Sequence, residues 1–191
     1  MTSMNPAVLA IAGPIGSGKT TTAALLARQL GWPRHGYGDT IRAIAAARGL
    51  APGRGTLQQL GAELAGTGWD TFTRLVLGHA RWAPGQPLIL DGLRHLPAAT
   101  ALRQVIAPLP GIIIYLDVPT GIALTRAGQR DQATSPGAVG ALHATERGLP
   151  AVRDHADLTV QAQELEPAQV AGQVICYVAA RLGHAPGDRC A

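Results

Sequence analysis

One lysine stands among fifteen arginines in this chain, and it occupies a segment with the composition of a phosphate-binding loop. The segment is Gly13-Pro14-Ile15-Gly16-Ser17-Gly18-Lys19-Thr20, which matches the pattern G-x-x-x-x-G-K-[ST]. Its glycines let backbone N–H groups turn inward around phosphates, its lysine brings a compact charge to the terminal phosphates, and its threonine hydroxyl ligates Mg²⁺. Arginine, a wide planar fork, substitutes poorly for that lysine. The segment therefore predicts a site for a nucleotide and Mg²⁺.

The surrounding sequence gives the order of elements that such a loop needs. Residues 7–12 form a short apolar run typical of a buried parallel strand, and residues 20–30 are rich in alanine and leucine and stop at Gly31. The phosphates would then meet a helix N-terminus. For ATP, the expected binding residues are Gly13, Ile15, Gly16, Ser17, Gly18, Lys19, Thr20 and Thr21.

Apolar runs and amphipathic stretches alternate along the rest of the chain, which predicts a parallel sheet between helices. Further strands are expected at 33–37, 87–91, 111–117 and 157–160, and helices at 38–48 (capped near Asp39), 56–66, 70–82, 97–106, 120–127 and 167–182, with 128–150 irregular. The predicted fold is α/β, three-layered, with a five-stranded parallel sheet, helices on both faces and a short lid. Residues 1–183 form one domain, with an acceptor-binding insertion at about 38–86, a lid at about 126–150 and a loose tail at 184–191.

Composition narrows the partners. The net charge of +4 is mild and the arginines are scattered, so a nucleic-acid surface is not expected. No apolar stretch approaches the length of a membrane span, and the N-terminus lacks a signal peptide pattern. Cys176 and Cys190 suggest neither a disulfide framework nor a zinc site, which fits a cytoplasmic protein. Five of the six histidines, at 35, 79, 95, 155 and 184, show no metal-ligand spacing and are interpreted as structural.

Three further segments, taken together with the loop, resemble the P-loop small-molecule kinases, above all the nucleoside monophosphate kinases of the adenylate and cytidylate kinase group. Tyr37-Gly38-Asp39-Thr40-Ile41-Arg42 is similar to the family's acceptor segment, and Leu90-Asp91-Gly92-Leu93-Arg94 to its strand-end segment. Ile114-Tyr115-Leu116-Asp117-Val118-Pro119 is similar to the strand before the lid helix. The resemblance spans roughly residues 7–160. It implies that Arg42 and Arg94 grip a phosphate on the acceptor, that Asp91 lies near Mg²⁺, and that Arg126 and Arg130 close over the transferring phosphoryl group.

The sequence also departs from that family. The usual proline after D-G is absent, Arg94 comes one residue early, and the lid region is short. The segments His143-Ala144-Thr145-Glu146-Arg147 and Thr56-Leu57-Gln58-Gln59-Leu60-Gly61 are more similar to dephospho-CoA kinase-like and phage deoxynucleotide kinase-like proteins. His143 and Glu146 are candidates for substrate contact. These departures leave the acceptor open.

Phosphoryl transfer requires two phosphates held in line with their charge balanced, which gives each candidate a role. The expected catalytic residues are Lys19, Asp91, Arg94, Arg126 and Arg130; the expected metal ligands are Thr20 and Asp91; the expected acceptor-binding residues are Tyr37, Asp39, Arg42 and Arg94. Plainer interpretations stay open: Arg42 and Arg94 as solvated arginines, Asp39 as a helix N-cap, Asp117 as a turn cap, and Trp69 and Phe72 as core.

The predicted function is ATP- and Mg²⁺-dependent phosphoryl transfer to a small phosphorylated acceptor, first a (deoxy)nucleoside monophosphate. Two alternatives remain: a kinase of another metabolite, such as dephospho-CoA or a natural-product precursor, and a nucleotide-binding regulatory protein with little turnover. A GTPase is excluded because an Asn-Lys-x-Asp segment cannot be built when Asn5 and Lys19 are the only residues of their kinds. A monomer or a homodimer is expected.

Overall fold

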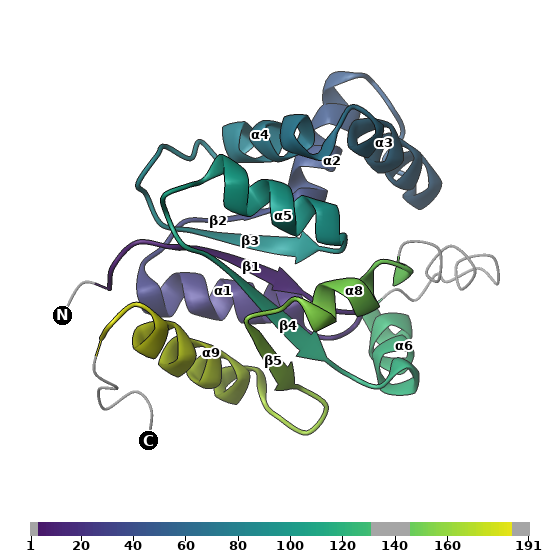
Figure 1. Cartoon of the computed structure of the whole chain (residues 1–191). Helices are drawn as coiled ribbons and strands as arrows, with labels where there is room; N and C mark the ends of the chain where they lie inside the picture. Colours follow the sequence, from purple (N-terminus) through teal and green to yellow (C-terminus); the bar gives the residue numbers. More distant parts are fainter. Residues whose placement is uncertain (1–3, 131–145, 185–191) are drawn as a thin grey trace.

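Five parallel strands form one sheet at the centre of the molecule (Figure 1). The computed structural model describes residues 4–130 and 146–184, with only the backbone for 127–130. The strand order is β2-β3-β1-β4-β5. The bounds are β1 Val8–Ala12, β2 Arg34–Gly36, β3 Leu88–Leu93, β4 Gly111–Asp117 and β5 Leu158–Gln161. The predicted five-stranded parallel sheet is confirmed.

Helices cover both faces of this sheet and make the fold three-layered (Figure 1). One face carries α1 (Lys19–Leu30) and α9 (Pro167–Arg181), and the other carries α2 (Tyr37–Ala47), α4 (Trp69–His79), α5 (Leu96–Val105) and α8 (Leu149–Asp154). Helix α3 (Arg54–Gly66) packs on α2 and α4, and α6 (Thr120–Arg130) follows β4. Within β1, Leu9 and Ile11 enter the core under α1 and α9, whereas Val8 and Ala10 enter the opposite core. Both cores need apolar residues, which explains the unbroken apolar run at 7–12.

Several local predictions were wrong. Helix α2 begins at Tyr37 with Gly36 as its N-cap, so Asp39 is not the cap. Asp39 lies in the first turn, where the positive end of the helix dipole stabilises a carboxylate. Helix α6 extends to Arg130, and α8 begins at the end of the stretch predicted to be irregular and continues to Asp154, where no helix was predicted. The expected lid residues 131–145, including His143, lie outside the described residues.

The cysteine prediction was also wrong. Cys176 on α9 is disulfide-bonded, although the sequence analysis expected no disulfide. The chain's other cysteine, Cys190, lies outside the described residues.

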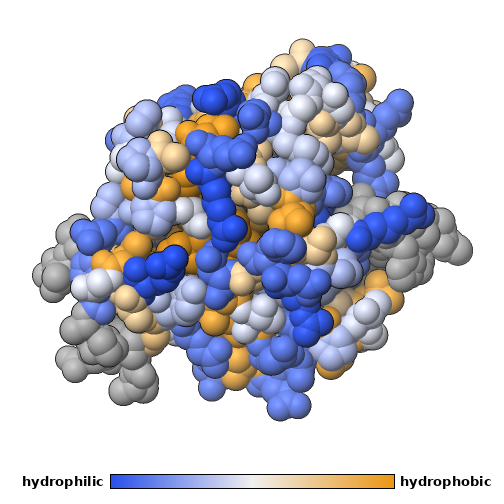
Figure 2. All heavy atoms as spheres, in the orientation of Figure 1, coloured by the Kyte–Doolittle hydropathy of each residue, from blue (hydrophilic) through white to orange (hydrophobic). Residues whose placement is uncertain are grey.

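The visible surface is mostly hydrophilic, with small hydrophobic patches between polar side chains (Figure 2). Among the described residues, the large hydrophobic side chains that stand exposed are Leu50 and Ile122, at 39% and 40%. Across residues 4–130 and 146–184, no helix has the length and apolar character needed to cross a membrane.

Candidate active site

The phosphate-binding loop connects the end of β1 to the start of α1. Gly13, Gly16 and Gly18 all have positive φ, at 140°, 84° and 87°, which L-residues with side chains rarely adopt. A Cβ at Gly16 would collide with the backbone carbonyl of Ala123, so α6 presses directly on the loop. Lys19 is buried at 8% exposure, and its Nζ donates to the Pro14 carbonyl oxygen at 2.6 Å. The loop therefore curls around its lysine at the N-terminus of α1, with Thr20 and Thr21 in the first turn.

A carboxylate from far along the chain binds this loop. The backbone N–H of Ile15 donates to Oε1 of Glu146 at 2.5 Å. Glu146 is partly buried and also lies close enough to Arg94 to influence its pKa. Backbone N–H groups of such loops are anion sites, so the Glu146 carboxylate occupies a position suited to a phosphate oxygen.

Asp91 lies beside the loop because of a bulge in β3. Ile11 pairs with Asp91 and Ala12 pairs with Leu93, which leaves Gly92 as the extra residue, with φ of 87°. On the other side, Gly36 of β2 pairs with Asp91. The carboxylate is thus fixed between the two strands that lead to the loop and to α2. Bulges next to active sites commonly direct a side chain in this way.

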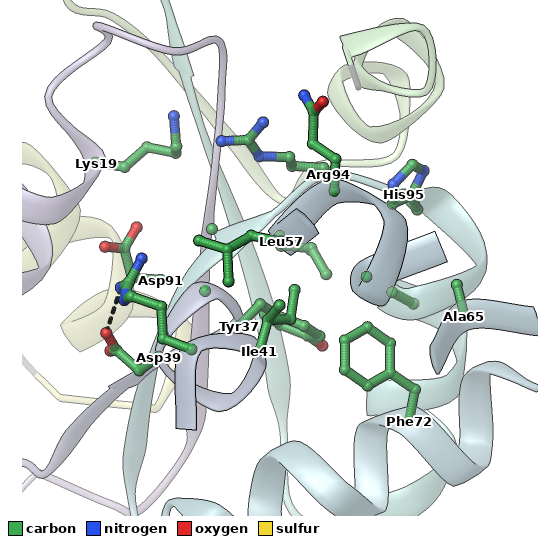
Figure 3. A pocket seen from close by; sticks show the side chains of 18 of the residues that line it. Lys19, Tyr37, Asp39, Ile41, Leu57, Ala65, Phe72, Asp91, Arg94 and His95 are labelled. Carbon is green, nitrogen blue, oxygen red and sulfur yellow. Dashed lines mark hydrogen bonds and ion pairs between the residues drawn. The ribbon is translucent and has the colours of Figure 1, made fainter. Parts of the chain in front are cut away.

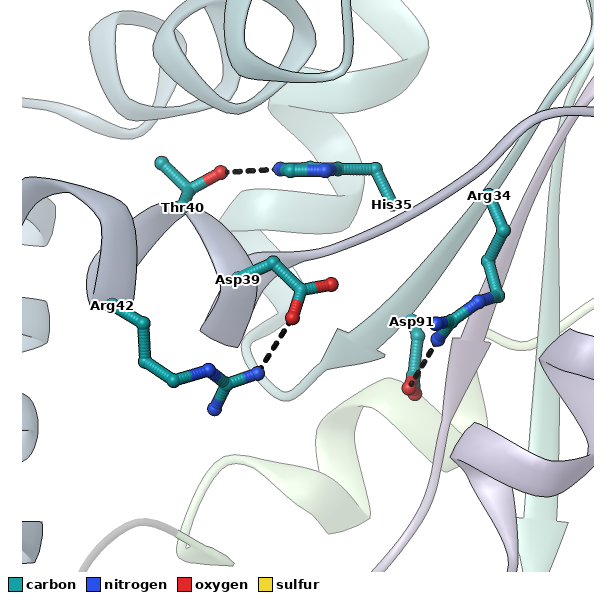
Figure 4. Close-up of polar contacts among 6 residues, drawn as sticks. All are labelled: Arg34, His35, Asp39, Thr40, Arg42 and Asp91. Carbon is teal, nitrogen blue, oxygen red and sulfur yellow. Dashed lines mark hydrogen bonds and ion pairs between the residues drawn. The ribbon is translucent and has the colours of Figure 1, made fainter.

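The two oxygens of the Asp91 carboxylate have different surroundings. Oδ2 lies 3.7 Å from Nη1 of Arg34, whereas Oδ1 is buried and has no hydrogen-bond partner among residues 4–130 and 146–184 (Figure 4). A buried, unsatisfied carboxylate oxygen near a phosphate loop fits Mg²⁺, which binds through one or two protein oxygens together with nucleotide phosphates. In the described part of the chain, no cluster of three or more His, Cys, Asp or Glu could hold a metal by itself. The binding of Mg²⁺ at Thr20 and Asp91, together with the nucleotide, stays a prediction.

Arg42 and Arg94 differ in their surroundings. Arg42 is exposed at 59% of its side chain and pairs with Asp39 at 2.6 Å (Figure 4). Arg94 is partly buried, and within the described ranges its guanidinium makes no hydrogen bond or ion pair. Burial lowers the pKa of Arg94, nearby Arg54 lowers it further, and the carboxylates of Glu146 and Asp91 oppose this shift. Arg94 is thus a desolvated cation whose five donors are available to an anion.

These groups surround one cavity of about 780 Å³ (Figure 3). Its charged end holds Lys19, Thr20, Asp91 and the arginines at 34, 42 and 94. Its other wall is apolar and comes from α2, α3 and α4, where Ile41, Leu57, Ala65, Trp69 and Phe72 line it. The cavity therefore joins a phosphate-binding end to an apolar and aromatic wall.

Tyr37 contributes a ring and not a hydroxyl to this wall. Its ring lines the cavity and meets Phe72 edge-on, with centroids 5.8 Å apart at 81°. Its hydroxyl is buried toward Thr73 without a hydrogen bond of regular geometry, and burial raises its pKa well above 10. The predicted contact of Tyr37 with a substrate would thus be through ring atoms.

The structure brings together most residues expected from the sequence. Lys19, Thr20, Tyr37, Asp39, Arg42, Asp91 and Arg94 all line the cavity. Arg126 does not line it; its Nη2 donates to the Gln163 carbonyl oxygen at 2.9 Å. Arg130 ends α6, and its side chain lies outside the description, so the lid roles of both arginines stay predictions. Asp117 accepts a hydrogen bond from Gln161 and pairs with Arg153 at 2.9 Å.

Sequence reasoning missed two lining residues, Arg34 and His95. Arg34 reaches the cavity from the first residue of β2, two positions before Gly36, on the edge strand that pairs with β3. The alternation of side chains along a strand could have indicated that Arg34 and Gly36 lie on the same face, but this pattern is weak in a strand of three residues. His95 directly follows Arg94, and its position just after the strand-end segment 90–94 was its available signal.

Comparison with known proteins assigns the family. An AAA domain family model matches residues 9–137, more than half of the chain. A UPF0200 protein of Pyrobaculum aerophilum is 30% identical over 129 residues, which are 68% of this chain and 69% of the relative. A UPF0200 protein of Aeropyrum pernix is 31% identical over 104 residues, 54% of this chain and 55% of the relative. The chain belongs to the AAA domain family and to the UPF0200 proteins.

Solved structures of small-molecule kinases share its fold. A shikimate kinase from Acinetobacter baumannii in complex with shikimate has a TM-score of 0.62 at 20% identity, over 92% of this chain and 94% of that one. A gluconokinase from Sinorhizobium meliloti has 0.63 at 16%, over 94% and 95%. The Mycobacterium tuberculosis APS kinase in complex with AMPPNP and APS has 0.60 at 17%, over 92% and 98%. The chain thus has the fold of P-loop small-molecule kinases. None of these three is a nucleoside monophosphate kinase, so the acceptor stays a prediction.

Proposed function

We propose that this protein is a P-loop kinase that uses MgATP to phosphorylate a small acceptor that already carries a phosphate, first a (deoxy)nucleoside monophosphate. The observation that carries the proposal is the single cavity that begins at Lys19 and Thr20, passes Arg94, and ends on an apolar wall. A domain that only binds ATP would need the phosphate-binding end of the cavity but not the apolar wall beyond it. Its charged entrance and apolar wall match an acceptor with a phosphate and a ring.

On the donor side, the loop and Lys19 would hold the nucleotide phosphates, and Thr20 and Asp91 would hold Mg²⁺. Bound Mg²⁺ would supply charge neutralisation at the phosphate oxygens. Phosphoryl transfer needs little covalent chemistry from the protein, because most of the rate comes from positioning and charge stabilisation. The buried Lys19 side chain and the bulge that fixes Asp91 are suited to that task.

On the acceptor side, Arg94 is the partly buried cation of the cavity that we assign to the phosphate of the acceptor. A guanidinium binds phosphate through two parallel hydrogen bonds, and it gains more when it is already desolvated. The apolar wall then selects what the phosphate is attached to. A sugar acid or polyol against Ile41, Leu57 and Phe72 would leave hydroxyl groups unpaired, which is unfavourable. A planar base can place its apolar faces against the same wall while its polar edge points away from it.

A coupled ADP-release assay tests the proposal, with MgATP and a panel of all ribo- and deoxynucleoside monophosphates, dephospho-CoA, shikimate and gluconate. Turnover of a nucleoside monophosphate supports it. Turnover of dephospho-CoA, shikimate or gluconate alone would mean that this compound, and not a nucleoside monophosphate, is the acceptor. ATP binding with no turnover of any compound supports the regulatory alternative.

The Arg94→Ala variant tests the role of that residue. Because charged hydrogen bonds contribute about 1.5–3 kcal/mol, we expect the acceptor KM to rise by roughly 10- to 100-fold while the KM for ATP changes little. Arg181→Ala, an exposed change on α9, is the matched control and should leave both constants unchanged. An equal rise in the KM of the acceptor and the KM for ATP in Arg94→Ala would contradict the assignment.

A further inference from the structure

His95 and Trp69 form a stacked pair at the aromatic side of the cavity. Both residues line it, and their ring centroids lie 5.0 Å apart at 39°. In Figure 3, Arg94 extends toward Lys19, whereas His95, its neighbour in sequence, lies on the side of the aromatic wall. Two consecutive residues thus serve opposite ends of one cavity.

The pair belongs to a row of rings that is unusual for this chain. Trp69 lies 6.3 Å from Phe72, and Phe72 lies 5.8 Å from Tyr37. The chain has only three Trp, three Tyr and one Phe, and three of these seven rings gather here. Tyr37 and Phe72 also belong to the hydrophobic core and Trp69 packs against it, so the rings form the boundary between that core and the cavity, where a planar ligand could stack on them.

His95 supplies the polar edge of that row. Its ring nitrogens make no hydrogen bond to any residue in the described ranges, and neither nitrogen is a buried orphan. Burial lowers the pKa of His95, and the charge of Arg94 lowers it further, so the imidazole is neutral at neutral pH. A neutral imidazole can donate from one nitrogen and accept at the other, and Nε2, across the ring from the Nδ1 that faces Gly148, is the nitrogen suited to the edge of a heteroaromatic ring.

The orientation of His95 is fixed from two directions. Trp69 stacks on its face, and Gly148, just before α8, approaches its edge. A Cβ at Gly148 would lie 3.1 Å from Nδ1 of His95 and 2.9 Å from the Arg94 carbonyl oxygen. Because the backbone of residue 148 closes that side, the ring is held in place before any ligand binds, which favours selective recognition.

We propose that His95, stacked on Trp69, is a specificity-determining residue that reads the edge of a planar heteroaromatic group on the acceptor. The proposal rests on the proposed function and deepens it by naming the part of the acceptor that is selected. Arg94 fixes the phosphate end, and His95 distinguishes one ring from another. A ring that cannot pair with His95 leaves an imidazole nitrogen unsatisfied against an apolar wall, which is unfavourable.

The test compares wild type with His95→Phe, which keeps a flat ring on Trp69 and removes both nitrogens. His79→Phe is the matched control, the same substitution at an exposed position on α4 that does not line the cavity. For each nucleoside monophosphate, kcat and KM are measured, together with the KM for ATP and the melting temperature. Ribose 5-phosphate, which has the phosphate but no base, serves as a competitive inhibitor.

We expect His95→Phe to raise the KM of the preferred acceptor by about tenfold, as the loss of one hydrogen bond in a desolvated site does, and to flatten the ranking of the bases. The inhibition constant of ribose 5-phosphate, the KM for ATP and the behaviour of His79→Phe should stay as in wild type. An unchanged ranking, or an equal loss for ribose 5-phosphate and the nucleotides, overturns the inference while the proposed function stands.

If wild type phosphorylates no nucleoside monophosphate, the proposed function fails and calorimetry decides the inference. Binding of a nucleoside monophosphate that weakens about tenfold in His95→Phe and not in His79→Phe still supports the role of His95. Absence of binding in wild type overturns both.

Discussion

Glu146 gives the most specific prediction, because its carboxylate accepts a hydrogen bond from a backbone N–H group that a nucleotide phosphate would need. Its Oε1 accepts from the Ile15 N–H at 2.5 Å, within the phosphate loop. A nucleotide phosphate that uses this N–H must displace the carboxylate and must also approach its negative charge. The Glu146→Gln variant removes the charge and keeps an oxygen of nearly the same size at the same place. We therefore expect Glu146→Gln to bind MgATP more tightly than wild type.

The magnitude follows from the kind of hydrogen bond that is lost. A hydrogen bond to a charged group contributes about 1.5–3 kcal/mol, and a neutral one contributes about 0.5–1.5 kcal/mol. The difference is about 1–1.5 kcal/mol, which corresponds to roughly a five- to tenfold decrease in Kd. Glu146→Ala removes the neutral hydrogen bond as well, so its Kd should fall at least as far.

Calorimetric titration of MgATP into wild type, Glu146→Gln and a control variant measures this directly. Glu164→Gln is a suitable control, because it removes a carboxylate in the loop after β5 that has no hydrogen bond to the phosphate loop. Raising the ionic strength should reduce the gain, since part of it is charge repulsion. Weaker or unchanged binding in Glu146→Gln would refute the reasoning and would mean that Glu146 supports the bound nucleotide.

Three further outcomes are expected. Lys19→Ala should lower kcat by about 10³-fold, as loss of a preorganised charge does, while the melting temperature stays near wild type; a large drop in that temperature would make the loss one of folding. Gly16→Ala should prevent nucleotide binding and lower the melting temperature, because its Cβ collides with the Ala123 carbonyl; normal ATP affinity would contradict the geometry. Burial holds the pKa of both His35 and His95 below 6.5. The unfolded chain therefore binds protons at these histidines at a higher pH than the folded chain does. The free energy of unfolding should be at its maximum above pH 6.5 and should decrease as the pH falls below that value. Urea unfolding from pH 7.5 to 5.5 checks this, and a His35→Gln/His95→Gln variant should lose less stability than wild type over that range.

The fold was predictable because its determinants are local and repeated. Strands β1, β3 and β4 are largely apolar runs that end near a turn, and each long helix has an amphipathic pattern with glycine or proline at an end. Helix α8 was missed because its six residues are too few for a periodic pattern. The start of α2 was misplaced because Asp39 is a common N-cap type, whereas Gly36 caps this helix.

The two ends of the cavity were predictable to different degrees. Phosphate chemistry demands particular residues at fixed spacing, so the loop, Asp91 and Arg94 could be found from the chain itself. Arg34 and His95 could not, because their contribution depends on how β2 pairs with β3 and on how α4 packs against the residue before α5. The contact between Glu146 and Ile15 spans 131 positions and has no local signature.

The same difference explains why a shared fold does not name the acceptor. The sheet, the loop and the helix behind it are constrained by the donor phosphates, so they persist among kinases of about 16–20% identity that are named for different acceptors. The wall made by α2, α3 and α4 is constrained only by what it must contact. Here it presents aliphatic side chains, a row of aromatic rings and the polar Gln58, with one neutral imidazole at the edge. A wall of that chemistry is unsuited to a polyol, so the identity of the acceptor is best sought among phosphorylated molecules that carry a planar ring.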